Sequence, residues 1–318
     1  MFKQPFPYFG GKSRVAGEVW TRFGDVKNYV EPFCGGCGLL LNRPPDHTGY
    51  VETVNDAWAF LSNFWRSVQL APHEVARWCD WPVSEIDLTA RHGWLLDQAE
   101  RVEANLLADP DWYDAKVAGW WCWGLCSWIG WGWCIRPKRK SPVKQLSGES
   151  AALTRNARPT MRLQGVHRRR PHVADEGRGV HRQGRNGTGA DSLDSYFLRL
   201  AERLRRVRVC CGDWKRVVTP AVTTRFGLTG VFLDPPYTTR AGREKNIYAK
   251  DSGTVGDEVH AWAVAHGHDP DMRIAVCGYE GEYDWPVGWT TLAWKSLGGS
   301  KTNRGRERIW FSPHCLAA

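Results

Sequence analysis

The stretch from Val231 to Tyr237 places the tightest constraint on how this chain can fold. Three apolar residues run into an acid, two prolines and an aromatic residue, the pattern of a buried parallel strand that ends abruptly. Pro235 and Pro236 stop the strand and stiffen the turn, so Asp234 and Tyr237 are held with little freedom. Ligands of open α/β sheets lie outside the carboxyl ends of the strands, so this turn predicts a functional site. The alternative is a proline-terminated strand with an incidental acid.

A glycine-rich turn follows another short apolar strand. The strand covers Tyr29 to Glu31, the turn covers Pro32 to Gly38, and an apolar helix start follows at Leu39. This strand-loop-helix order is typical of a nucleotide-type binding loop in a doubly wound sheet. Cys34 and Cys37 have Cys-x-x-Cys spacing, which leaves a metal or redox pair as an alternative. No second pair with metal-ligand spacing is evident, so we expect no metal site.

Three shorter motifs are candidate ligand contacts, and each has a plain alternative. Gly10 and Gly11 would let the backbone approach a ligand, with Lys12 behind them, although on these residues alone an ordinary Gly-Gly turn is the stronger explanation. Asp56 ends a strand from Gly49 and could accept from ribose hydroxyls, or it could be a helix N-cap. Asp213 follows a strand and could accept from an adenine amine, or it could be a turn residue.

Residues 71–190 lose the alternation of strand and helix, and we expect them to form an insert. Tryptophans crowd residues 118–133, where we expect them to build a small core of the insert. Basic runs follow, in a chain whose 43 Lys and Arg outnumber its 34 Asp and Glu. Such cations favour phosphate contacts, although a solvated surface loop is the alternative. The candidate DNA-binding residues are Arg136, Lys138, Arg139, Lys140, Arg168, Arg169, Arg170, Arg178 and Arg182.

The order of these motifs resembles the DNA adenine-N6 methyltransferase family. The resemblance covers roughly residues 7–68 and 193–250 and runs from the Gly-Gly-Lys turn through the glycine loop to Asp-Pro-Pro-Tyr. It implies an α/β, Rossmann-like S-adenosylmethionine-dependent methyltransferase fold with a large inserted target-recognition domain. The catalytic domain would be discontinuous, residues 1–70 and 191–318, around the insert at 71–190. The end of the chain looks most like versions carried by phages and prophages.

The resemblance also implies which residues hold S-adenosylmethionine. The implied cofactor-binding residues are Phe9, Gly10, Lys12, Glu31, Pro32, Phe33, Gly35, Asp56, Asp213 and Asp234. One departure concerns Cys37, which stands where many relatives have a second closely spaced glycine. The insert shares little with well-known members, so no target sequence carries over.

The expected catalytic residues are Asp234, Pro235, Pro236 and Tyr237. Adenine N6 is a poor nucleophile because its lone pair is delocalised into the ring. The Asp234 carboxylate and the Pro235 main-chain carbonyl could accept its two hydrogens and leave the lone pair aimed at the methyl donor. The amine is inaccessible in a duplex, so the base would be flipped out and stacked on Tyr237. No covalent enzyme intermediate is needed.

Two other functions remain open. A cytosine-N4 or RNA amino-methyltransferase could share the fold, although such relatives more often carry Ser or Asn where this chain has Asp234. A non-catalytic DNA-binding protein that retains the fold is the second. We expect double-stranded DNA as the partner, no membrane, no metal and a monomer. The amino terminus has no apolar signal region and the cysteines are scattered, so we expect a cytoplasmic protein with free thiols.

Overall fold

A computed structural model of the 318-residue chain describes residues 2–8, 10–49, 51–128, 132–135, 192–237, 254–294 and 305–317. The described strands are β1 (Asn28–Glu31), β2 (Val51–Asp56), β3 (Val207–Cys211), β4 (Thr229–Leu233), β5 (Met272–Tyr279), β6 (Thr290–Ala293) and β7 (Glu307–Phe311). The described α-helices are α1 (Ala16–Phe23), α2 (Ala59–Leu70), α3 (Pro72–Cys79), α4 (Glu85–Ala108), α5 (Ala115–Ser127), α8 (Leu193–Leu204) and α9 (Val255–His266).

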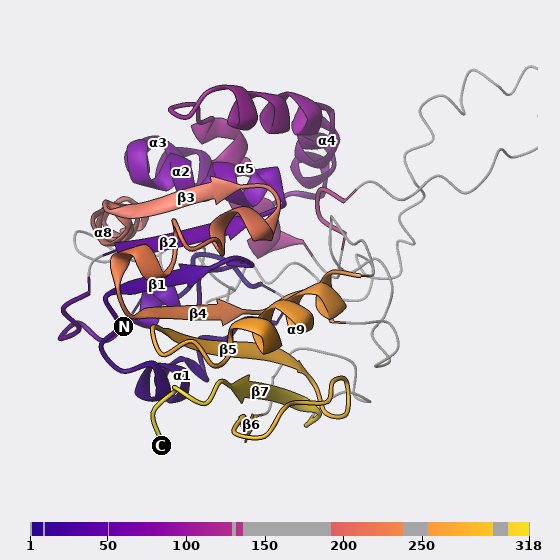
Figure 1. Ribbon diagram of the computed structural model, residues 1–318. Helices are drawn as coiled ribbons and strands as arrows, with labels where there is room; N and C mark the ends of the chain where they lie inside the picture. Colours follow the sequence, from indigo (N-terminus) through magenta and orange to yellow (C-terminus); the bar gives the residue numbers. More distant parts are fainter. Residues whose placement is uncertain are drawn as a thin grey trace, which may run out of the picture.

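One seven-stranded sheet runs through the described part of the molecule in the order β3-β2-β1-β4-β5-β7-β6 (Figure 1). Strands β1 to β5 are parallel, whereas β7 runs antiparallel to both β5 and β6. The direction in which the chain adds strands reverses between β1 and β4. Ligands of open α/β sheets bind at such a reversal, outside the carboxyl ends of the strands. The mixed α/β class predicted from the sequence is confirmed.

Both faces of the sheet are covered, which explains why its central strands are apolar on both sides. Alternate residues of a strand point to opposite faces. Tyr29 and Phe232 belong to a cluster shared with α1, α2, α5 and α8, whereas Val30 and Val231 pack with α9 and the 3₁₀ turn after β3. The central strands β1 and β4 are therefore anchored from both sides, and the loops that follow them start from rigid supports.

The helices after α2 pack onto the sheet layer. Helix α5 packs against α2 and α3, and α3 packs against α8. Trp121 and Trp123 of α5 are fully buried in the same hydrophobic cluster as Phe64 and Trp65 of α2. The expectation that these tryptophans form a separate small core is therefore wrong, because their indoles extend the main core.

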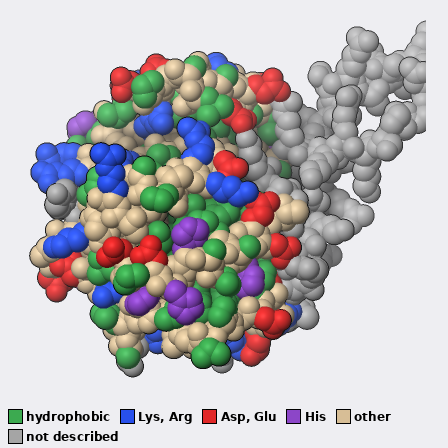
Figure 2. Space-filling model, viewed as in Figure 1, with side chains coloured by type: hydrophobic (Ala, Val, Ile, Leu, Met, Phe, Trp, Pro, Cys, Tyr) green, Lys and Arg blue, Asp and Glu red, His purple; other side chains and the backbone are tan. Residues whose placement is uncertain are grey.

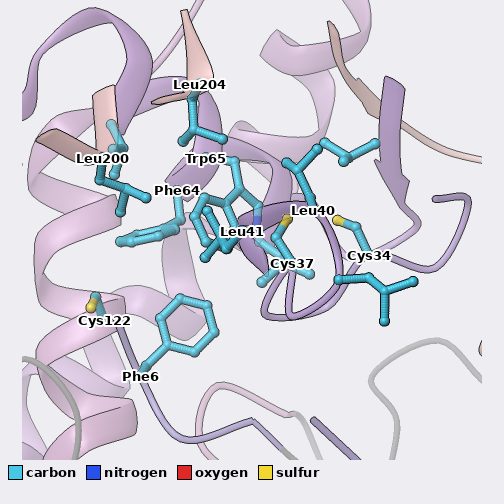
Figure 3. Packing of buried hydrophobic residues seen from close by; sticks show 14 of the residues in the cluster. Phe6, Cys34, Cys37, Leu40, Leu41, Phe64, Trp65, Cys122, Leu200 and Leu204 are labelled. Atoms are coloured by element: carbon cyan, nitrogen blue, oxygen red, sulfur yellow. The ribbon is translucent and has the colours of Figure 1, made fainter. Parts of the chain in front are cut away.

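The segment Phe2–Tyr8 threads between this helical layer and the glycine-rich turn after β1. Phe6 is 1% exposed and contacts Phe64, Trp65 and Trp121, with ring centroids 5.1 to 5.9 Å apart. Figure 3 shows Phe6 beside Phe64 and Cys122, with the turn cysteines on the other side of Trp65. The beginning of the chain is thus part of the core beneath the turn.

The chain after the glycine-rich turn differs from the expected α-helix. A 3₁₀ helix of three residues, η1 (Leu40–Asn42), takes its place. Pro44 and Pro45 follow at once, and proline cannot donate the backbone hydrogen bonds that a longer helix requires. The turn therefore leads into a short, tightly packed connection to β2.

A basic cluster lies away from the carboxyl ends of the parallel strands. Figure 2 shows Lys and Arg side chains gathered on the side of α8 and the start of β3. Arg205, Arg206 and Arg208 are exposed there. Because they stand at the amino end of β3, they do not line the edge where β1 and β4 end. Within the described ranges, every helix is too short or too polar to cross a membrane.

Replacing Phe6 with alanine should lower the free energy of unfolding by about 3–5 kcal/mol, because it leaves a cavity in the packed aromatic core. Urea denaturation at constant pH measures this change. Phe226→Ala is the matched control, since that ring is 39% exposed and should lose under about 1 kcal/mol. Equal losses in the two variants would contradict the placement of Phe6 in the core.

Candidate active site

The turn after β4 and the beginning of the chain meet at one ion pair. Lys12 Nζ lies 2.6 Å from Asp234 Oδ2 and donates a second hydrogen bond of 2.9 Å to the Gly10 carbonyl. The Lys12 side chain is 5% exposed and that of Asp234 is 20% exposed. The carboxylate is therefore held from behind by a buried cation while part of it stays open to solvent.

The charges around Lys12 keep it protonated. Burial, the largest single influence, lowers the pKa of Lys12, but the Asp234 and Glu307 carboxylates together outweigh it and raise that pKa. Cys277 lies on β5, and its thiol pKa is raised by burial and by the adjacent Asp234 carboxylate. A neutral thiol and a charged ammonium thus stand behind Asp234 at neutral pH.

Tyr237 is fixed by its hydroxyl and by its ring. The hydroxyl donates to Glu307 Oε2 at 2.8 Å and lies 3.3 Å from Asp234 Oδ1. The ring meets Tyr279 edge to face, with centroids 4.7 Å apart. Sequence reasoning singled out Tyr237 but missed Glu307. The available signal was its register, because Glu307 shares one strand face with the apolar Ile309 and Phe311 and so points into the protein.

The glycine-rich turn after β1 needs its unusual backbone. Gly35 has φ +45°, and a Cβ there would lie 2.5 Å from the Tyr8 ring. Cys37 has φ 52°, in the left-handed region that favours glycine. A cysteine in place of the glycine found in many relatives therefore strains the backbone here. Trp65 Nε1 donates to the Gly35 carbonyl at 3.0 Å, and Gln4 Nε2 donates to the Gly36 carbonyl at 2.9 Å. These side chains hold the turn in shape.

Asp56 connects the end of β2 to this turn. Its carboxylate accepts from the Gly35 amide at 3.2 Å and from the Trp58 amide at 2.9 Å. Burial raises the pKa of Asp56 to about 6, and the backbone hydrogen bonds partly oppose the rise. The helix N-cap alternative is not what is found, because the N-cap of α2 is Trp58. Asp56 therefore joins two loops at the carboxyl edge.

Asp213 and Phe33 flank the next loop at the same edge. Asp213 is exposed, and its side chain accepts from the Lys215 amide at 2.9 Å, capping the 3₁₀ helix η3 (Trp214–Val217). The Phe33 and Trp214 rings lie 5.9 Å apart. Asn55, which sequence reasoning missed, donates to the carbonyls of Pro32 and Gly212, both at 3.0 Å. One buried amide thus ties the loops after β1 and β3 together.

Glu31 points into the core beneath the glycine-rich turn. It is 3% exposed and accepts from the Tyr29 hydroxyl at 2.9 Å. Burial raises the pKa of Glu31 to about 8, more than its hydrogen bonds lower it. Cys34 and Cys37 are also buried and free, and the described ranges hold no cluster of His, Cys, Asp or Glu suited to a metal ion.

The remaining sequence candidates divide into two groups. Pro235 and Pro236 follow β4 as expected, so Asp234 and Tyr237 stand at the carboxyl end of that strand. The second group lies outside the described residues: Phe9 and the basic candidates Arg136, Lys138, Arg139, Lys140, Arg168, Arg169, Arg170, Arg178 and Arg182. The structure therefore brings together Lys12, Asp234, Tyr237 and the glycine-rich turn.

Residues 8–78 match the family model described as D12 class N6 adenine-specific DNA methyltransferase. The match begins at Tyr8 and includes Lys12, the glycine-rich turn and Asp56. The predicted resemblance to the adenine-N6 methyltransferase family is thereby confirmed. No curated protein sequence matches the chain.

Replacing Glu31 with glutamine should flatten the fall in stability as pH rises from about 4.5 to about 8. The native state keeps a proton on Glu31 in this window that the unfolded state releases, so wild-type stability declines as pH rises. Thermal melts at several pH values measure the slope. Glu18→Gln is the control, since that side chain is 59% exposed and should leave the slope unchanged. An unaltered slope in Glu31→Gln would contradict a buried, protonated Glu31.

Proposed function

We propose that this chain, whose resemblance to the adenine-N6 DNA methyltransferases is confirmed, transfers a methyl group from S-adenosylmethionine to the N6 amine of a flipped adenine at specific sites in DNA. The observation that carries the proposal is the Asp234 carboxylate, held at the end of β4 by Lys12 Nζ at 2.6 Å. Strand β4 pairs with β1, and the glycine-rich turn that follows β1 lies within the residues that match the family model. Asp234 and the glycine-rich turn therefore both lie where the strand order reverses, between β1 and β4.

The residues at the carboxyl edge suit S-adenosylmethionine, which would supply a methyl group activated by its sulfonium charge. The glycine-rich turn keeps its tight shape because Gly35, with φ +45°, has no Cβ to meet the Tyr8 ring. Asp56 is the last residue of β2, and Asp213 and Phe33 lie on the loops after β3 and β1. A carboxylate at the tip of β2 could accept from both ribose hydroxyls. The proposed set is completed by Phe9, Gly10, Lys12, Glu31, Pro32 and Asp234.

Asp234 retains hydrogen-bonding capacity for a substrate amine. A carboxylate has about four lone-pair sites, and the described partners of Asp234 include Lys12 on Oδ2 and Tyr237 on Oδ1. With the Pro235 carbonyl as second acceptor, both amine hydrogens would be bound. The nitrogen lone pair would then no longer be delocalised into the purine ring and would be aimed at the methyl donor. The Tyr237 ring would stack on the extruded base.

We assign recognition of double-stranded DNA to the insert, residues 71–190. The catalytic domain would then be discontinuous and have a Rossmann-like fold. The sheet order with an antiparallel β7 supports that assignment of the fold. Helix α5 ends at Ser127 and leads in sequence toward the basic runs at 136–140 and 167–182. The exposed arginines beside α8 stand at the amino edge, so phosphate contacts near the site would come from the insert.

Asp234→Asn should reduce methyl transfer to DNA by about 10²-fold or more, because the amide donates where the substrate amine also donates. The measurement is tritiated methyl transfer followed by nucleoside analysis, with the wild-type label expected in N6-methyladenine. Asp271→Asn is the control, since Asp271 is exposed and directly precedes β5, at the amino ends of the parallel strands. Label in N4-methylcytosine would overturn the base assignment, and a fully active Asp234→Asn would remove this acid from the mechanism.

Asp56→Asn should weaken S-adenosylmethionine binding by about tenfold or more, because one charged hydrogen-bond acceptor is lost. In the wild type, affinity should fall as pH drops below about 6, where Asp56 becomes protonated. Equilibrium dialysis with labelled S-adenosylmethionine between pH 5 and 8 measures both effects. Unchanged affinity in the variant would show that Asp56 does not hold the cofactor.

A further inference from the structure

A second buried carboxylate faces the proposed catalytic turn. Glu307 is the first residue of β7 and is 6% exposed. Its Oε2 accepts the Tyr237 hydroxyl at 2.8 Å, which is shorter than the 3.3 Å between that hydroxyl and Asp234. Charge-assisted O–H···O bonds are short and roughly twice as strong as neutral ones. The stronger bond of the Tyr237 hydroxyl is therefore to Glu307.

The position of Glu307 is set by the sheet. Glu307 pairs with Tyr279 in the antiparallel register of β5 and β7, and Tyr279 also meets the Tyr237 ring edge to face at 4.7 Å. The pair Glu307 and Tyr279 thus contacts both ends of Tyr237, one at the hydroxyl and one at the ring. Two strands of the sheet hold a side chain that itself lies on a loop.

Lys12 provides the charge balance for this arrangement. Its pKa is raised chiefly by Asp234, against burial, and Glu307 contributes to the rise. The Lys12 ammonium lies 5.6 Å from the centre of the Tyr237 ring. One buried cation therefore faces two carboxylates and the tyrosine that bridges them.

We propose that Glu307 is a positioning residue that accepts the Tyr237 hydroxyl hydrogen and fixes the ring on which the target adenine stacks. The inference rests on the proposed function and deepens it, since it names the group that orients the base-stacking side chain. Glu307 acts through Tyr237 and touches no reacting atom. Its removal should lower turnover by freeing the ring and should leave the cofactor turn after β1 unaffected.

The test compares four variants by steady-state methyl transfer. E307A and Y237F should each lower kcat by about tenfold, the size expected for one charge-assisted hydrogen bond, with KM for S-adenosylmethionine unchanged. The double variant should be no slower than either single one, because both remove the same bond. E307Q keeps an acceptor oxygen and should recover most of the activity. Multiplied losses in the double variant, or a fully active E307A, would overturn the proposal.

A second measurement is independent of catalysis and of the folding of E307A. Protein labelled with 3-fluorotyrosine gives a fluorine NMR signal for Tyr237, identified by its loss in Y237F. This signal should shift in E307A and shift less in E307Q. Glu280→Ala is the matched control, because that acid is paired with Arg308 at 2.8 Å, is 63% exposed and should leave the signal in place.

The two measurements separate the two proposals. A wild type that methylates no adenine would refute the proposed function, and the fluorine signal alone would then decide whether Glu307 holds Tyr237. If E307A does not fold, E307Q decides: a small shift of the Tyr237 signal with most of the activity retained would support the acceptor role, and an unmoved signal would overturn it. A Tyr237 signal that is identical in E307A and wild type would overturn the proposal.

Discussion

The ion pair between Lys12 and Asp234 is the interaction on which the site depends. It joins residues 222 positions apart in the sequence, with the ammonium nitrogen 2.6 Å from the carboxylate oxygen. A cation that is 5% exposed cannot be solvated by water, so it needs that carboxylate. Breaking such a pair by removing one partner costs about 3–5 kcal/mol. The same bond that locks the beginning of the chain onto the sheet therefore fixes the acid proposed to act on adenine.

The glycine-rich turn depends on contacts from three directions. Gln4 reaches it from the beginning of the chain, Trp65 from α2 and Asp56 from β2. The φ of 52° at Cys37 is conformationally costly for a residue other than glycine, so these hydrogen bonds stabilise a shape the turn would not keep alone. The surface proposed to receive the cofactor is thus made rigid before any ligand arrives.

The local sequence was enough to predict the strands and the turns that carry Asp234 and Gly35. An apolar run that ends at Pro or Gly can be recognised without knowing what packs against it. The local sequence was insufficient wherever partners come from distant segments. Glu307 was missed because its role comes from Tyr237, 70 positions earlier. The tryptophans of α5 were placed in a separate core because tertiary packing, which local sequence does not contain, brings them onto α2. The helix expected after the turn shortened to a 3₁₀ helix before two prolines.

The most direct measurement is a crystal structure of the protein with a cofactor analogue and DNA carrying its target site. We predict an extruded adenine whose N6 lies about 3 Å from a carboxylate oxygen of Asp234. The ring of Tyr237 should stack on that base while its hydroxyl stays hydrogen-bonded to Glu307. An adenine bound elsewhere, with Asp234 paired to Lys12 and out of reach of the base, would contradict this prediction.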